Sequence, residues 1–377
     1  MTAPSLATLI DIENEIQGQE KWSSFVDGGD GFFYGIPFDA RRVVKFDPLD
    51  KSLTEIGPDF GGSGSKWRCG VLANTGSIYC APYGTDHMLK INTNDGTAVE
   101  TLDNLELPET GGGLWESEAL ASDNSIYYMP YFARRIMKLN PGNDSLSSLG
   151  DDLGEDEGKY SGTMVGNDDF VYGIPDCATR IIEYNSATTD TTTVGRAAWK
   201  FCGGNGVLGG DGDIYSVNDS GQVLKVDTTN GNYTWIGDPI YSGGGSGWGD
   251  PIVGGDKCIY WPPFNANRVL KFDPETQQLP SLVGDDLAAE GEDLAEGECK
   301  LKWQSGALAT DGVIYCIPFY PSRVLAIDPF KECSATLQIN MTLYPDELGC
   351  LFLKDEECDE TFFETLLRKF GESVSTY

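Results

Sequence analysis

Histidine is almost absent from this chain, which has one, His87, among 377 residues. Because catalytic triads, multi-histidine metal centres and histidine-based acid/base pairs need this side chain, most of their chemistry is excluded. Basic residues are also scarce: 26 Lys and Arg stand against 59 Asp and Glu, and the formal net charge is −33. Such a charge repels the phosphates of nucleic acid and anionic membrane surfaces, so we expect neither as a partner.

Targeting and membrane-spanning segments are missing as well. The first twenty residues show no basic segment followed by an apolar one, and no run of 18 apolar residues occurs. We therefore expect no signal peptide, no transmembrane segment, and a cytoplasmic or other soluble intracellular location. The ten cysteines lack CxxC spacing and are interpreted as reduced thiols. With 40% hydrophobic residues the chain can still bury a large core.

One sequence unit recurs seven times along the chain. The segment GFFYGIPFDARRVVKFDP at 31–48 returns, for example, as NSIYYMPYFARRIMKLNP and as KCIYWPPFNANRVLKFDP. Each unit has a tyrosine at the same place, and these register tyrosines are Tyr34, Tyr79, Tyr127, Tyr172, Tyr215, Tyr260 and Tyr315. An aromatic residue stands twelve positions before each of them, except that Phe201 is displaced by two. A pair correlated over seven units indicates a structural repeat.

Each unit breaks into four short runs separated by turn signals, as in KWRCGVLA, SIYCAPY, HMLKINT and GTAVETL. Four meandering strands in roughly 45 residues are typical of a β-propeller blade, and the helical spacing of 3.6 is absent. The sequence therefore predicts an all-β fold, a seven-bladed β-propeller of four-stranded antiparallel blades. The WD dipeptide and the kelch Gly-Gly signature are both missing.

The predicted propeller covers residues 1–338. Its blades lie near 21–57, 66–102, 114–150, 159–195, 200–237, 247–284 and 302–338. The N-terminal segment 4–11 resembles the fourth strands, and we expect it to close the ring as the outer strand of blade seven; the alternative is 332–339. In the remaining segment, 339–377, apolar residues from Phe362 to Phe370 follow helical spacing, which predicts a short C-terminal helical extension.

These repeats resemble a family of acidic propeller-like proteins abundant in diatoms and related algae. Its units read GxIYxxPxxAxRVLKxDP, preceded by KWxxGxLAxDG, and the likeness covers nearly the whole chain. The resemblance implies the fold and carries no functional residues. A looser likeness is to virginiamycin B lyase, whose blades read DGxIxxxxxxxxxI. That enzyme uses histidine and a metal, whereas this chain has a single histidine.

The repeated residues also predict a candidate ligand or partner rim on one face of the ring. The tryptophans that open the first strands and the residues that open the third strands are expected to meet there. The rim residues are Trp22, Trp67, Trp115, Trp248, Trp303, Arg42, His87, Arg135, Arg180, Gln222, Arg268 and Arg323. Guanidinium groups would bind an acidic peptide, a sulfated or phosphorylated compound, or a carboxylate. Alternatively, each arginine stacks on a tryptophan or bridges two blades.

Two acidic insertions, 151–158 and 285–298, are expected on the same face. Clustered carboxylates suit calcium, but neither insertion matches a calcium-loop pattern, so we predict no metal. The GxGxxG of Gly204, Gly206 and Gly209 lies in a predicted first strand and its hairpin, not before a helix, so no cofactor is expected.

A complete repeat framework without a catalytic constellation favours a non-enzymatic intracellular scaffold with an unidentified protein partner. The alternative is a propeller that binds a small molecule or acts as a lyase or hydrolase. Its site would be lined by carboxylates at the channel mouth, either with or without a divalent cation. A self-assembling structural protein is a third hypothesis, and the net charge argues against it.

Overall fold

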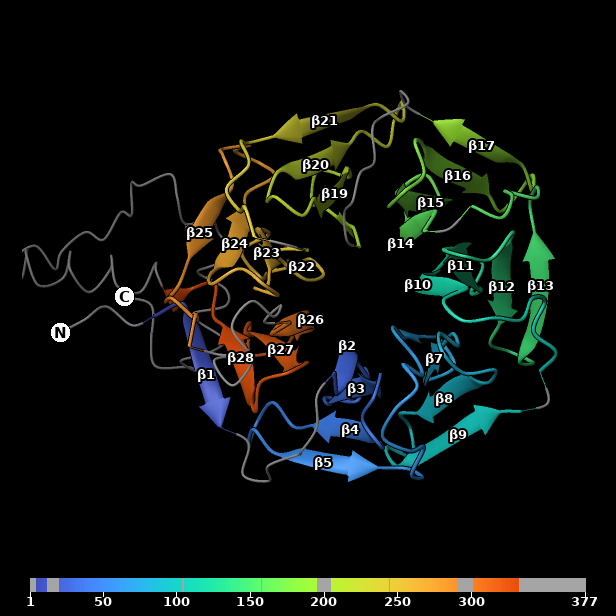
Figure 1. Cartoon of the computed structure of the whole chain (residues 1–377), viewed down its shortest axis with the longest axis horizontal. Helices are drawn as coiled ribbons and strands as arrows, with labels where there is room; N and C mark the ends of the chain where they lie inside the picture. Colours follow the sequence, from blue (N-terminus) through green and yellow to red (C-terminus); the bar gives the residue numbers. More distant parts are fainter. Residues whose placement is uncertain are drawn as a thin grey trace, which may run out of the picture.

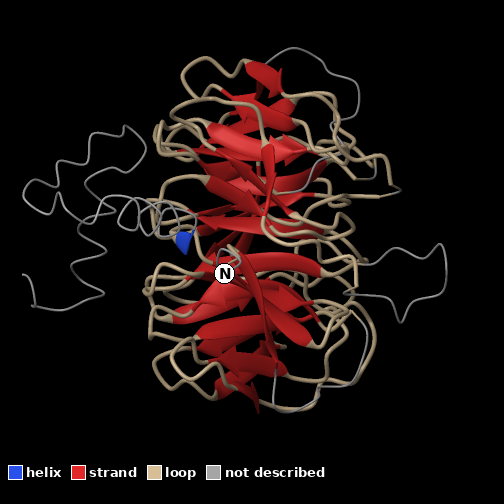
Figure 2. Cartoon of the chain, turned by 90° about the vertical axis from the view of Figure 1, so that its left-hand side faces the viewer, coloured by secondary structure: helices blue, strands red, loops and turns tan. Residues whose placement is uncertain are grey.

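The computed structural model describes residues 5–11, 20–103, 105–156, 158–194, 205–243, 245–289 and 301–331. These residues form seven four-stranded antiparallel sheets, arranged as blades around a common axis (Figure 1). The prediction of an all-β, seven-bladed propeller is confirmed. Seen from the side, the blades form a thick disc with loops on both faces (Figure 2). Within the described ranges no helix is long and apolar enough to cross a membrane.

The strands of a blade follow one another outward from the axis. Blades one and two contain β2 (Trp22–Asp27), β3 (Phe33–Pro37), β4 (Val43–Phe46), β5 (Leu53–Ile56), β6 (Val71–Leu72), β7 (Ser77–Cys80), β8 (Met88–Asn92) and β9 (Ala98–Leu102). Blades three and four contain β10 (Trp115–Leu120), β11 (Ile126–Pro130), β12 (Ile136–Asn140), β13 (Ser145–Leu149), β14 (Tyr160–Val165), β15 (Phe170–Pro175), β16 (Ile181–Asn185) and β17 (Thr191–Val194).

The remaining blades repeat this order. Blades five and six contain β18 (Val207–Leu208), β19 (Ile214–Val217), β20 (Val223–Val226), β21 (Tyr233–Ile236), β22 (Ile252–Val253), β23 (Ile259–Trp261), β24 (Val269–Phe272) and β25 (Ser281–Val283). Blade seven contains β26 (Trp303–Leu308), β27 (Ile314–Pro318) and β28 (Arg323–Ile327).

The fourth strand of blade seven is β1 (Ala7–Asp11), which pairs antiparallel with β28 and places Ala7 opposite Ile327. The segment considered as the alternative for this position, 332–339, lies outside the described residues, as do all residues of the expected C-terminal helix.

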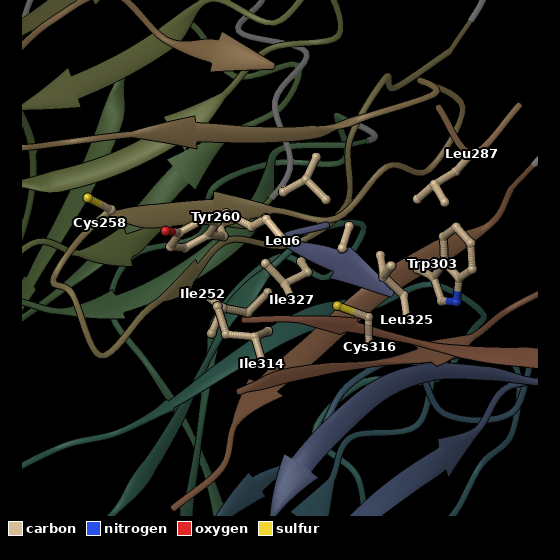
Figure 3. Packing of buried hydrophobic residues seen from close by; sticks show 12 residues of the cluster. Leu6, Ile252, Cys258, Tyr260, Leu287, Trp303, Ile314, Cys316, Leu325 and Ile327 are labelled. Carbon is tan, nitrogen blue, oxygen red and sulfur yellow. The ribbon is translucent and has the colours of Figure 1, made fainter. Parts of the chain in front are cut away.

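The core lies mainly between neighbouring blades. Buried apolar side chains of blades six and seven, including Tyr260, Trp303 and Ile327, pack into one cluster together with Leu6 beside β1 (Figure 3). Burying a side chain of this size contributes about 1.5–3 kcal/mol relative to leaving it exposed. Because each blade shares its core with a neighbour, no blade is expected to be stable alone.

The register tyrosines anchor a polar network at the opposite ends of the first strands from the tryptophans. In six blades the tyrosine hydroxyl donates to an aspartate four residues earlier, in the pairs Tyr34–Asp30, Tyr127–Asp123, Tyr172–Asp168, Tyr215–Asp211, Tyr260–Asp256 and Tyr315–Asp311. In blade two the position four residues before Tyr79 holds Thr75, and Tyr79 instead donates to Asp144 of blade three, at 2.6 Å. A neighbouring blade thus supplies the missing carboxylate.

The blades differ at the axis. The first strand has six residues in blades one, three, four and seven, but two in β6, β18 and β22. In blade six the cause is local: Pro251 has no N–H for pairing, and the N–H of Asp250 donates to the carbonyl of Gln304 in blade seven at 2.6 Å. A Cβ on Gly249 would lie 2.1 Å from the same carbonyl oxygen, so only glycine fits there.

Candidate ligand-binding site

The tryptophans of the predicted rim lie inside the blades. All five are buried, with exposed fractions between 0% for Trp22 and 4% for Trp248. In every case the indole N–H donates to the backbone carbonyl of the residue twenty positions later, in the pairs Trp22–Arg42, Trp67–His87, Trp115–Arg135, Trp248–Arg268 and Trp303–Arg323. The bond joins the start of the first strand to the start of the third, which gives each tryptophan a structural role in its own blade.

Three rim residues at the start of the third strands hold the end of their own blade. The guanidinium groups of Arg42 and Arg135 donate to the carbonyls of Gly57 and Gly150, fifteen residues later. In blade five the amide of Gln222 donates to Gly237 at the same offset, with a distance of 3.1 Å. Gln222 therefore replaces arginine without loss of the hydrogen bond.

The other rim residues at the start of the third strands differ in their exposure and in the charged groups beside them. Arg180 and Arg268 are exposed. Arg323 Nε lies 4.0 Å from the carboxylate of Asp11. His87 is 40% exposed and lies beside two aspartates, Asp86 at 3.0 Å and Asp103 at 3.7 Å. Ligand binding by these side chains stays a prediction.

A set of buried lysines was not singled out from the sequence. Each lies directly before the aromatic residue that stands twelve positions ahead of a register tyrosine. These lysines, which are 0–6% exposed, are Lys21, Lys66, Lys159 and Lys302. Each ammonium donates to backbone carbonyls, as Lys21 does to Tyr320 at 2.9 Å and Lys66 to Gly61 at 3.0 Å. Burial lowers the pKa of Lys21 to about 8. The repeated Lys-Trp dipeptide is the sequence signal that could have revealed these lysines. It marks a position at which a buried lysine ammonium donates hydrogen bonds to backbone carbonyls of the loops.

A group of charged and polar side chains lies on the innermost segments of the blades. We define the axial cluster as Arg68, Cys69, Glu116, Glu118, Asn205 and Asp250. All six lie on the innermost segments of their blades, and Arg68, Cys69, Asn205 and Asp250 precede the shortened strands β6, β18 and β22. Irregular backbone at these places lets side chains adopt directions that a regular first strand would not allow.

Contacts between neighbouring blades join the members of the axial cluster in three pairs. Arg68 Nη1 lies 3.6 Å from Glu116 Oε1, and the guanidinium lies 5.6 Å from the centroid of the Tyr83 ring. The thiol of Cys69 donates to Glu118, and the amide of Asn205 donates to Asp250 Oδ1 at 3.0 Å. The other amide atom, Asn205 Oδ1, is buried and has no hydrogen-bond partner within the described part of the chain.

The axial cluster spans the centre of the ring. Arg68 and Glu118 belong to blades two and three, whereas Asp250 belongs to blade six on the other side of the axis (Figure 1). Burial lowers the pKa of Arg68, whereas the charges of Glu116 and Asp250 raise it. Burial raises the pKa of Glu118, and the charge of Asp250 adds to that shift. Charged side chains from opposite blades therefore lie on the innermost segments around the same axis (Figure 1).

Burial changes the protonation of the carboxyl groups. It raises the pKa of Glu118 to about 8, and the hydrogen bond from Cys69 opposes this shift. It also raises the pKa of Asp250 to about 6, against the opposing effects of Arg68 and Asn205. The pKa of Glu116 is raised by burial too, while Arg68 lowers it. Near neutral pH the site thus combines the protonated carboxyl of Glu118, the ionised carboxylate of Asp250 and the guanidinium of Arg68.

Four aromatic rings lie on loops between second and third strands, and one of them, Tyr83, contacts Arg68 of the axial cluster. Ring centroids follow one another at 5.8 Å from Phe264 to Phe319, 5.7 Å from Phe319 to Phe38 and 5.8 Å from Phe38 to Tyr83. We call these four residues the aromatic arc. It ends at Tyr83, which also contacts Arg68. Further around the ring, the hydroxyl of Tyr131 donates to Asp176 at 3.2 Å.

The axial cluster escaped the sequence analysis because its residues depart from the repeat. The position to compare directly follows the aromatic residue that stands twelve positions before the register tyrosine. Blades two and three have the charged residues Arg68 and Glu116 there, whereas blades one, four, six and seven have Ser23, Ser161, Gly249 and Gln304. A comparison of the seven units at this position would have found two of the charged residues. The placement of charged residues from opposite blades around one axis required the structure.

The acidic insertions and the GxGxxG motif, the other features considered in the sequence, contribute no residue to the axial cluster. In the first acidic insertion, Arg134 forms ion pairs with Asp152 at 2.5 Å and Glu155 at 2.6 Å. No cluster of potential metal ligands occurs among the described residues, and most of the second insertion lies outside them. Of the GxGxxG motif, Gly206 and Gly209 flank β18, and Gly204 lies outside the described residues.

No protein-family model matches the chain, and no curated protein matches it. Solved structures match its fold. A streptogramin B lyase has a TM-score of 0.66 at 13% identity, covering 85% of this chain and 96% of the other. Virginiamycin B lyase from Staphylococcus aureus has a TM-score of 0.65 at 11% identity, with coverages of 85% and 98%.

An extracellular domain of a putative hybrid two-component system from B. thetaiotaomicron is also similar. Its TM-score is 0.65 at 11% identity, covering 89% of this chain and 42% of that one. At these identities the similarity shows a shared fold, and this fold serves both an enzyme and a domain of a two-component system.

Proposed function

We propose that this propeller binds a small polar molecule at the axial cluster. The observation that supports this most is the placement of Arg68, Glu116, Glu118 and Asp250 on the innermost segments of blades on opposite sides of the axis (Figure 1). Charged side chains rarely lie this close to the centre of a fold unless they are paired or have a ligand. The repeated tryptophans and lysines already satisfy the structural needs common to the blades, so the axial cluster is not needed for them.

The lyases of similar fold give this proposal a second support. One solved structure is a catalytically inactive form of virginiamycin B lyase with quinupristin, so a propeller of this shape can hold a small molecule. In the present chain the only histidine, His87, lies beside Asp86 and Asp103 and is not a member of the axial cluster. Any reaction at the axial cluster would therefore use Glu116, Glu118 or Asp250 as acid or base.

A thermal-shift screen of a metabolite library tests binding. A compound present at 100 times its Kd stabilises the folded state by about 2.7 kcal/mol. We expect at least one compound to raise the melting temperature of the wild type and of Asp59→Asn, but not of Asp250→Asn. Asp59 is a matched control because it pairs with Arg41 at 2.6 Å away from the axis. Equal shifts in all three proteins, or no shift at all, would contradict the proposal.

The second candidate function is the protein-interaction scaffold. Its support is exposed apolar surface on the outer edges of blades five and six. Trp235 is 37% exposed, Leu282 43% and Leu279 72%. Pro280 lies against Gly237, so the two edges meet. Affinity capture with wild type and with Trp235→Ser plus Leu282→Ser tests this function: a scaffold that uses this edge loses its partners in the variant.

A further inference from the structure

We propose that the compound bound by the axial cluster is a neutral polyhydroxylated molecule, a sugar or short oligosaccharide. This inference rests on the proposed function and names the class of ligand. Charge balance, hydrogen-bonding capacity and the aromatic ring of Tyr83 at the site support it.

Charge balance disfavours strongly charged ligands. The guanidinium of Arg68 would repel a cation, while Glu116 and Asp250 would repel an anion from the same space. The formal net charge of −33 further lowers the local concentration of anions around the protein. A neutral ligand avoids both repulsions and can still use every charged group as a donor or acceptor.

Hydrogen-bonding capacity is unusually mixed at this site. Arg68 has five N–H donors, and among the described residues it contacts Glu116 and the Tyr83 ring. The carboxylates of Glu116 and Asp250 accept hydrogen bonds, and within the described part of the chain the buried Asn205 Oδ1 has an unused acceptor. Adjacent hydroxyl groups on a sugar both donate and accept, so a vicinal diol can pair with a guanidinium or a carboxylate.

Tyr83, at the end of the aromatic arc, supplies the apolar part of the site, while Phe38 and Phe319 of the arc are buried. A pyranose ring has C–H faces that pack on aromatic rings, while its hydroxyl groups point outward. Tyr83 is the link, since its ring contacts Arg68 and it follows Phe38 in the aromatic arc. Binding sites for small molecules commonly combine such apolar walls with a few convergent polar groups.

A glycan array that carries neutral, sulfated, uronic-acid and amino-sugar glycans tests the inference. Labelled wild type and Asp59→Asn should bind neutral glycans, and Asp250→Asn and Arg68→Gln should bind them at least about tenfold more weakly, the loss of one charge-assisted hydrogen bond. Binding of a neutral hit should change little between about 0.05 M and 0.5 M NaCl, because no net charge is neutralised. Melting temperatures of all variants establish that each is folded.

The outcomes separate this inference from the proposed function. Binding confined to sulfated, acidic or amino glycans, binding of neutral glycans unchanged in both cluster variants, or no binding to the array would overturn the sugar assignment. The metabolite screen then decides independently whether the axial cluster binds any small molecule. A non-sugar compound that depends on Asp250 would leave the proposed function standing and this inference rejected.

Discussion

The ammonium of Lys51 lies 4.2 Å from the centroid of the Tyr315 ring and donates a hydrogen bond to its hydroxyl. Lys51 belongs to blade one and Tyr315 to blade seven. In blade seven Ala326 occupies the third-strand position where blades one, two, three, five and six have a lysine, as with Lys138 over Tyr127. The first blade therefore supplies the cation that the last blade lacks.

Replacing Lys51 should weaken the contact between the first and last blades. Lys51→Met loses the hydrogen bond to Tyr315 and the ion pair with Asp311 at 3.5 Å. Both groups are about one third exposed, so we expect a loss of about 1 kcal/mol in the free energy of unfolding, measured with urea. Lys257→Met is the control, because that ion pair, with Glu275, is long and exposed. Equal effects of the two substitutions would contradict the prediction.

The indole hydrogen bonds should be essential to stability and not to binding. Trp67→Phe leaves the carbonyl of His87 without its donor at 2.8 Å and creates a small cavity in place of a side chain that is 2% exposed. We expect a loss of about 2–4 kcal/mol in the free energy of unfolding. Trp235→Phe, on the surface, should stay within about 0.5 kcal/mol. A stable Trp67→Phe protein with weakened ligand binding would restore the rim interpretation.

Arginine and glutamine should be interchangeable at the start of the third strand. Arg135→Gln can keep the bond to the Gly150 carbonyl, as Gln222 does to Gly237, whereas Arg135→Ala cannot. We therefore expect Arg135→Ala to lower the free energy of unfolding by about 1 kcal/mol and Arg135→Gln to change it by less than half of that. Urea denaturation of the three proteins measures this order, and a reversed order would show that the guanidinium has another role.

The protonation of Glu118 should make stability depend on pH. Its pKa is about 8 in the folded protein and 4.5 ordinarily, so between these values the folded state binds more protons than the unfolded state. Stability therefore falls as the pH rises through this window. Asp250, with a pKa of about 6, contributes only at the lower end.

Glu118→Gln should flatten the dependence between about pH 6 and 8, measured by urea denaturation at several pH values. The control Glu155→Gln changes an exposed carboxylate that pairs with Arg134 and should keep the wild-type slope. If wild type and Glu118→Gln have parallel slopes across this range, Glu118 is ionised in the folded protein and the assignment is wrong.

The repeats were sufficient to predict the fold, because the seven register tyrosines and their aromatic partners report a period that few architectures share. They did not point to the axial cluster. Trp67 and Arg42 belong to positions that hold the same residue in five blades, and both hydrogen-bond within their own blade, to the carbonyls of His87 and Gly57. Arg68 and Asp250 are far apart in the sequence, and only the closed ring brings them to one axis.

The exchange of polar partners between blades also limits how the repeats can be rearranged. Tyr79 depends on a carboxylate from blade three, and Tyr315 on a cation from blade one. These blades are therefore not equivalent modules that could be shuffled or duplicated freely. Each is matched to the blade that follows it, so a circular permutant that keeps the order of neighbours retains both contacts, whereas a chain with two blades exchanged would leave a buried tyrosine with the wrong neighbour.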